Sequence, residues 1–248
     1  MRLMKRILSA AAVLALSASL LVGCSSGTAS SVPVSASSAA ESTVSSVEET
    51  ASSAVDENEA AAAQLLNDLT GSYQELWPVI LADEYKQTWL DDCTALVGED
   101  NAEAAFEKLS SMVTGDVYGE DAVKAYANGG GAYFCGFTNS LAILTFDGET
   151  STISGTDKDG NVLFSHAYHY IGMEPVRGLY EFESDDADSG EFTYFFLAPD
   201  TSAETYHIEF RYGSDAEALS QYDTGEYAYW LASGISTDCD QTMIDNCI

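Results

Sequence analysis

The sequence predicts a mainly β domain with helical additions, an α+β fold in which N-terminal helices precede a closed or half-closed antiparallel barrel. Apolar residues recur at helical spacing in the first third of the folded part. From about residue 132 onward they alternate with polar residues instead, and turn signals separate the alternating segments. No strand–helix–strand alternation occurs, so the sequence does not predict a parallel sheet.

Each element follows from the local pattern of apolar residues and turn signals. The predicted helices cover residues 60–69, 74–90, 102–112 and 121–127, followed near the end of the chain by 216–222 and 237–247. The predicted strands cover residues 132–137, 141–146, 151–155, 162–171, 177–183, 192–197 and 205–212. The segment 157–161 resembles half of a calcium loop, but no Glu follows at the required position, which favours a hairpin turn.

The charge balance excludes one class of partner. The chain has 9 Lys and Arg against 40 Asp and Glu, a net charge of −31. So acidic a surface repels phosphate backbones, so nucleic-acid binding is excluded. It also repels anionic lipid headgroups, so any membrane attachment has to be covalent or apolar. The chain has 3 His, which limits histidine-based catalysis and metal binding.

The N-terminus has the features of a secretion signal. Arg2, Lys5 and Arg6 precede an apolar run over residues 7–22 that is too short to span a membrane. The run ends in Leu-Val-Gly-Cys, which resembles the lipobox of bacterial lipoproteins and implies acylation of Cys24. We therefore expect a signal peptide over 1–23 and a membrane-anchored, extracytoplasmic protein. The alternative is an ordinary secreted protein in which Cys24 is coincidental.

A flexible tether is predicted over residues 24–62. Residues 25–55 hold twelve Ser and six Ala and no aromatic residue. Such a segment buries too little apolar area to offset the entropy of ordering. Residues 63–248 are then expected to form one folded domain.

Four cysteines follow Cys24. An even number of cysteines outside the cytoplasm is compatible with disulfide bonds. They are Cys93, Cys135, Cys239 and Cys247. If 237–247 is helical, its two cysteines are eight residues apart and too distant to bond each other. Any bridges would then run from the tail to Cys93 or Cys135. Four reduced thiols are the alternative.

Histidines sit in two of the predicted strands. His166 and His169 are three residues apart in one strand, so they are expected on opposite faces and are interpreted as structural. In the strand 205–212, even positions are apolar and odd positions carry Thr205, His207, Glu209 and Arg211. The odd face is either exposed to solvent or forms a polar cup in which His207 and Glu209 converge.

Several segments resemble the ZinT (YodA) family of extracytoplasmic zinc- and cadmium-binding domains. The similar segments are residues 71–81, 168–172, 179–194 and 203–208, with Gly213 after the last. They occur in the same order over nearly the whole domain. The resemblance implies a calycin, or lipocalin-like, barrel that binds a metal and assists a zinc ABC-type transporter.

The resemblance also implies a metal site, with departures from the family pattern. That family uses three histidines, whereas only His207 is carried over here, with Asp200 and Glu209 as substitute ligands by position and chemistry. We therefore expect a divalent-metal-binding lipoprotein that is not an enzyme, with zinc favoured and other divalent cations also accepted. The alternative is a calycin-type module that has lost the metal site and binds a small organic ligand or a protein partner. A hydrolase would need a nucleophile and base, and His207 beside Thr205 is the only local pair.

Overall fold

The computed structural model describes residues 57–248 apart from residues 116, 131 and 132. The predicted signal peptide, the acylation site Cys24 and most of the predicted tether lie outside the described residues. The structure begins in a helix, residues 57–68, whose apolar side chains pack into the domain core. Within the described part, no helix is long and apolar enough to cross a membrane.

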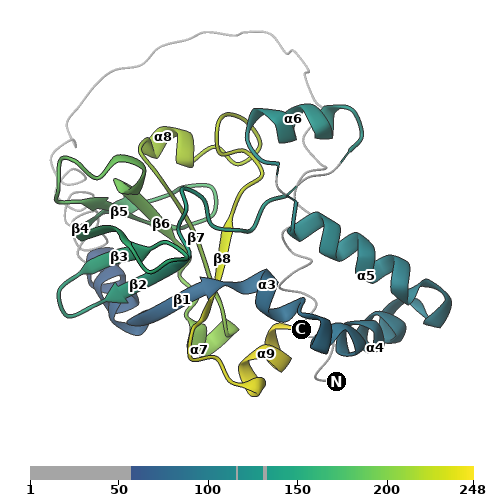
Figure 1. Ribbon diagram of the computed structural model, residues 1–248. Helices are drawn as coiled ribbons and strands as arrows, with labels where there is room; N and C mark the ends of the chain where they lie inside the picture. Colours follow the sequence, from purple (N-terminus) through teal and green to yellow (C-terminus); the bar gives the residue numbers. More distant parts are fainter. Residues whose placement is uncertain (1–56, 116, 131–132) are drawn as a thin grey trace, which may run out of the picture. The chain divides into compact units, whose positions relative to one another are not determined.

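A closed antiparallel barrel forms the centre of the described domain (Figure 1). Each strand pairs with its neighbours in the sequence, and β1 pairs with β8 to close the barrel. The strands are β1 Gly71–Glu75, β2 Ile143–Asp147, β3 Thr152–Thr156, β4 Val162–Met173, β5 Tyr180–Ser184, β6 Tyr194–Leu197, β7 Ile208–Gly213 and β8 Ala232–Ser236. This eight-stranded up-and-down architecture is the one found in lipocalins, and it confirms the predicted fold class.

The helices come from two regions of the chain, one before β2 and one after β5. The helix of residues 57–68 precedes β1, as predicted, but most of the helical third is inserted between β1 and β2. The inserted elements are α3 Leu76–Ile80, η2 Asp83–Tyr85, α4 Lys86–Val97, α5 Glu99–Val113 and α6 Glu120–Ala127. The later ones are η3 Gly190–Phe192, α7 Ser202–Thr205, α8 Ala216–Leu219 and α9 Gln241–Cys247. Figure 1 shows α4 and α5 as a helical hairpin.

Two predicted elements are wrong, and one strand was not predicted. The helix predicted over 74–90 is instead the end of β1 followed by α3, η2 and the start of α4. The strand predicted over 132–137 forms only isolated bridges, from Phe134 to Thr114 and Trp230. Strand β8 was missed, because its sequence Ala-Ser-Gly-Ile-Ser has little β propensity and no apolar alternation.

Aromatic side chains fill the barrel. Phe195, Phe210 and Tyr212 are fully buried, and their rings stack with centroids 5.3 to 6.5 Å apart. Tyr212 uses its hydroxyl at the barrel end, where it accepts from the Thr138 N–H at 2.6 Å and donates to the Thr138 carbonyl at 2.9 Å. The interior is therefore a packed core.

The predicted turn at residues 157–161 is present. The Asp157 carboxylate accepts from the backbone N–H groups of Asp159 and Asn161, both at 2.9 Å. The Asn161 side-chain amide also donates to this carboxylate at 2.9 Å, and it is the largest cause of the lowered pKa of Asp157, to which the backbone bonds add. The loop thus satisfies its own carboxylate, which agrees with a turn.

Candidate functional site

The strand that carries the predicted metal ligands begins later than the sequence indicates. β7 starts at Ile208, whereas Thr205 ends helix α7 and Tyr206 turns the chain with a φ of 66°. At the start of this helix the Glu204 carboxylate accepts from the Thr201 N–H and hydroxyl, both at 3.4 Å, which is half of a capping box. His207 therefore lies in the turn, just before the strand.

Thr205 fixes the orientation of His207. The His207 Nδ1 lies 2.8 Å from the Thr205 carbonyl oxygen, and the Thr205 hydroxyl donates to the His207 carbonyl at 2.9 Å. A carbonyl oxygen only accepts, so Nδ1 must carry the proton. The neutral imidazole then presents the lone pair of Nε2. Metal-binding histidines are commonly held in this way, by a hydrogen bond from the other ring nitrogen.

Glu209 faces that nitrogen. Its Oε1 is 4.0 Å from His207 Nε2, and the two side chains are 40% and 29% exposed respectively. Two donors on a tetrahedral zinc are about 3.3 Å apart for bonds of about 2.0 to 2.1 Å, so a small side-chain movement suffices to share an ion. Burial raises the pKa of Glu209, while the charges of His207 and Arg177 oppose this and Asp200 adds to it.

Asp200, the third predicted ligand, is close but not converged. It is exposed in the loop between β6 and α7. Its negative charge adds to the raised pKa of Glu209. Among residues 57–248 that the structure describes, no group of three or more His, Cys, Asp or Glu side chains is placed to hold a metal ion. The donor set therefore fits a divalent cation only in part, with two donors from His207 and Glu209.

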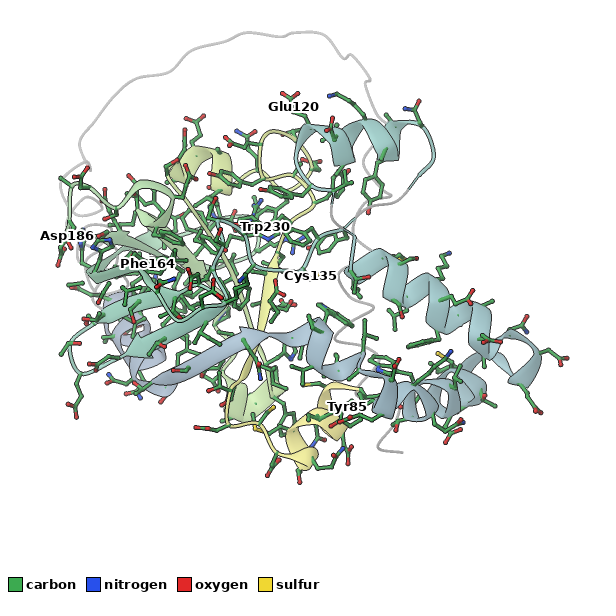
Figure 2. The ribbon with its side chains drawn as sticks, viewed as in Figure 1. Tyr85, Glu120, Cys135, Phe164, Asp186 and Trp230 are labelled. Atoms are coloured by element: carbon green, nitrogen blue, oxygen red, sulfur yellow. The ribbon has the colours of Figure 1, made fainter. Side chains whose placement is uncertain are left out.

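The other two histidines lie on opposite faces of β4, as predicted. His166 Nδ1 is 2.6 Å from Asp186 Oδ2, and His169 Nδ1 is 2.7 Å from Asp185 Oδ1. Both acids belong to the loop after β5, and Figure 2 shows Asp186 at that edge of the barrel. Both imidazole–carboxylate pairs tie the loop to the strand, and His169 Nε2 also lies 4.0 Å from Glu183 Oε2.

Sequence reasoning missed Arg177 and its surroundings. Arg177 lies in the turn between β4 and β5, and its guanidinium carbon is 4.2 Å from the centre of the Tyr222 ring. Arg211 lies 4.4 Å from the same ring centre and is fully buried. One signal was available in the sequence: these are the only arginines after residue 6.

The four cysteines of the described domain are free thiols. Burial raises the pKa of Cys135 to about 12 and of Cys247 to about 11. Cys247 donates to the Tyr206 carbonyl at 3.7 Å, so α9 contacts the turn that carries His207. With such pKa values both groups stay protonated near neutral pH, which makes them poor metal ligands. Figure 2 labels Cys135 in the middle of the domain, near Trp230.

Comparison with known proteins gives several similar solved structures, of which two are described here. No family model and no curated protein sequence matches the chain. One similar structure is Zn(II)-bound AdcA from Streptococcus pneumoniae, with 14% identity, a TM-score of 0.46 and coverage of 73% of this chain. The other is the Zn(II)-bound ZinT-like domain of the same protein, with 15% identity, a TM-score of 0.46 and coverage of 73% of this chain and 89% of that one. The match spans only about a third (34%) of AdcA. Function is therefore argued from the residues of this chain.

Proposed function

We propose that this chain is a lipoprotein that binds a divalent cation, with zinc favoured, outside the membrane and assists its capture or uptake. His207 Nε2 and Glu209 Oε1 are the protein donors, and Asp200 is the carboxylate that joins them when the ion is present. Cys24 carries the lipid anchor. A zinc ABC-type transporter is the partner that the ZinT resemblance implies.

The orientation of His207 is the observation that carries this proposal. Its protonated Nδ1 is held by the Thr205 carbonyl at 2.8 Å, so the Nε2 lone pair points toward Glu209 at 4.0 Å. The pair is partly exposed, which leaves a path for an ion. A bound cation would also remove the burial cost of the Glu209 charge, which the raised pKa reflects.

The test is a calorimetric zinc titration of the metal-stripped, full-length chain in detergent at about 0.5 M salt, where weak binding by scattered carboxylates is screened. His207→Ala should weaken zinc binding at least about tenfold, or about 1.4 kcal/mol. His166→Ala is the matched control, because His166 Nδ1 is paired with Asp186 at 2.6 Å and its side chain is only 18% exposed. Affinity should also fall as the pH is lowered, because metal ligands have to be deprotonated.

A second candidate function is a binding module for a small organic ligand or a protein partner. The observation that favours it is the lack of a third converged donor within the described residues. Equal zinc affinity for wild type and His207→Ala at high salt would contradict the metal proposal and leave this one.

The proposed anchor has a separate test. Cys24→Ala should leave the protein unprocessed or released from the cell. Partitioning of that variant with membranes after a high-salt wash would contradict the lipid anchor and leave the metal proposal untouched.

A further inference from the structure

A hollow opens on the barrel surface where strands β1 and β2 separate. Their pairing ends at Tyr73 and Leu144. Beyond this point the last two residues of β1 pair with β8, and the first residue of β2 pairs with Thr156 of β3. The space between the strands has a volume of about 470 Å³, within the range of about 300 to 1,000 Å³ that is typical of small-molecule sites. Figure 1 shows β1 running directly into α3, whose Pro78 and Val79 form one wall.

The floor of this hollow is apolar. Leu141 is buried there, whereas Ile143 and Val79 are half-buried and keep part of their apolar surface toward the space. Pro78 is exposed beside them. Covering these side chains with an apolar group removes apolar surface from water, which is favourable. The floor therefore favours a ligand that carries apolar side chains.

Two neutral polar side chains line the same space without a partner. Gln74 and Thr156 are half-buried, and in the part of the chain that the structure describes neither side chain makes a hydrogen bond. Strand alternation and register place both on the outer face of the sheet together with Ile143. An amide and a hydroxyl each donate and accept, so the two groups match the N–H and C=O of a peptide bond. A ligand with such a bond would satisfy groups that the protein leaves unpaired.

One carboxylate and one ammonium also line the hollow. Glu75 Oε1 accepts from the Phe137 N–H at 2.5 Å, and Glu75 takes part in none of the ion pairs of the described domain. A carboxylate has about four acceptor positions, so Glu75 can still accept from a ligand. Lys158 pairs with its neighbour Asp159 at 2.8 Å, but its side chain is 82% exposed. Exposed pairs of this kind contribute little, so the ammonium can turn to a ligand at small cost.

The other acid at the hollow does not compete for a ligand. Asp157 accepts three hydrogen bonds within its own turn, from Asp159 and Asn161. Glu75 at the end of β1 and Lys158 in the turn between β3 and β4 are then the charged groups left. A simple cation would match only the carboxylate, and a simple anion only the ammonium. Charge complementarity therefore favours a ligand with both charges.

We propose that this hollow binds a short apolar peptide in its zwitterionic form. The terminal ammonium of the peptide contacts Glu75, and its terminal carboxylate contacts Lys158. A peptide bond between them meets the free amide and hydroxyl, and the apolar side chains cover the floor. The candidate metal pair, His207 and Glu209, does not line this hollow, so the inference goes beyond the proposed metal-binding function and does not depend on it.

The experiment titrates the full-length chain, labelled with 15N and held in detergent, with the tripeptide Ala-Leu-Ala. The NMR signals of the Gln74 side-chain amide should shift and saturate. Two blocked peptides test the charges, because the N-acetylated form lacks the ammonium and the C-terminal amide lacks the carboxylate. The acetylated peptide should bind about tenfold more weakly, since a charge-assisted contact to a half-buried carboxylate is lost. The amidated peptide should bind about threefold more weakly, since Lys158 is exposed.

Two variants identify the protein side of each contact. Glu75→Gln keeps an acceptor for the Phe137 N–H, and it should weaken binding of the free tripeptide about tenfold without affecting the acetylated one. Lys158→Gln should weaken binding of the free tripeptide about threefold without affecting the amidated one. Glu149→Gln and Lys108→Gln are the matched controls. They remove exposed charges from the β2–β3 turn and from α5, outside the hollow, and should change neither affinity.

Three outcomes would overturn the inference. The first is a Gln74 side-chain amide that does not shift at about 10 mM tripeptide, a concentration that detects even millimolar binding. The second is equal binding of the free and acetylated peptides, which would mean that the carboxylate makes no contact. The third is equal binding of the free and amidated peptides, which would mean that the ligand is a simple cation. None of these comparisons needs a variant, so they hold even where a substitution disturbs folding, and a failed zinc titration leaves them unaffected.

Discussion

The two faces of strand β7 differ in their side chains and in what covers them. The inner face carries Ile208, Phe210 and Tyr212, which are all buried in the barrel core. The outer face carries Glu209, which is 40% exposed, and Arg211, which is fully buried. Alternation along the strand decides which side chains share a face, but it does not decide what covers that face.

The difference arises from the chain that follows the strand. Residues 214–231 run back over the outside of β7. Their backbone carbonyls accept hydrogen bonds from the Arg211 guanidinium there. They do not bond the Glu209 side chain in the same way, so one end of the outer face is closed and the other stays open. The candidate site lies at the open end, two residues along β7 from Arg211, whose guanidinium donates to the carbonyls of the covering segment.

The inner face should be the most sensitive to substitution. Phe210→Ala removes a fully buried ring and should lower the free energy of unfolding by about 3 to 5 kcal/mol. Urea denaturation followed by tryptophan fluorescence measures this loss. Phe210→Leu is the control and should cost less, because it retains most of the buried apolar volume. A loss for Phe210→Ala no larger than that for an exposed residue would mean that β7 is not packed as described.

On the outer face, substitution should lower stability only at Arg211, where residues 214–231 cover the strand. Burial lowers the pKa of Arg211, yet its guanidinium bonds three carbonyls, so Arg211→Met should leave acceptors unsatisfied and cost about 1 to 3 kcal/mol. Lys86→Met, an exposed cation on α4, is the comparison and should change stability little. If the two variants unfold at the same denaturant concentration, the cover over Arg211 contributes nothing to stability.

The same contrast explains how far the sequence could predict this structure. The alternating strands from β2 to β7 were found within a few residues, because each has one apolar face and turn residues on both sides. The closing strands β1 and β8 were not found. β1 runs directly into α3, whose Leu76 and Ile80 continue a helical pattern, and β8 is made of small residues that only the closed barrel places in a sheet.

The candidate site was predicted in part for a similar reason. The proximity of His207 and Glu209 followed from their spacing of two along the chain. The contact between Arg177 and Tyr222 could not be predicted, because it joins residues 45 positions apart and depends on where the loop 214–231 folds. Spacing predicts local contacts, and long-range partners require the fold.

A smaller loss of stability is expected at Tyr212, the last of the inner-face residues of β7. Tyr212→Phe removes the hydroxyl that bonds the N–H and carbonyl of Thr138 but keeps the buried ring. The expected cost is about 1 kcal/mol, from the loss of these bonds to the half-buried backbone of Thr138. Thermal unfolding measures it, and Tyr194→Phe is the control, because its hydroxyl bonds only the partly exposed Glu183. Equal effects in the two variants would mean that Thr138 finds other partners.

The last prediction concerns the reactivity of the Cys247 thiol, which contacts the turn before β7. Burial raises the pKa of Cys247 from its ordinary 9.0 to about 11, so the folded state favours the protonated thiol. The higher pKa lowers the thiolate fraction near pH 8 about 100-fold, and alkylation should slow accordingly. The rate should rise with pH toward 11 and should reach the ordinary thiol rate in denaturant at any pH. Peptide mapping after timed iodoacetamide treatment resolves each cysteine, and Cys239, just before the start of α9, is the internal comparison. If Cys247 is alkylated as fast in the folded as in the unfolded protein, α9 is not docked on the Tyr206 carbonyl and the open end of the outer face is less ordered than the closed end.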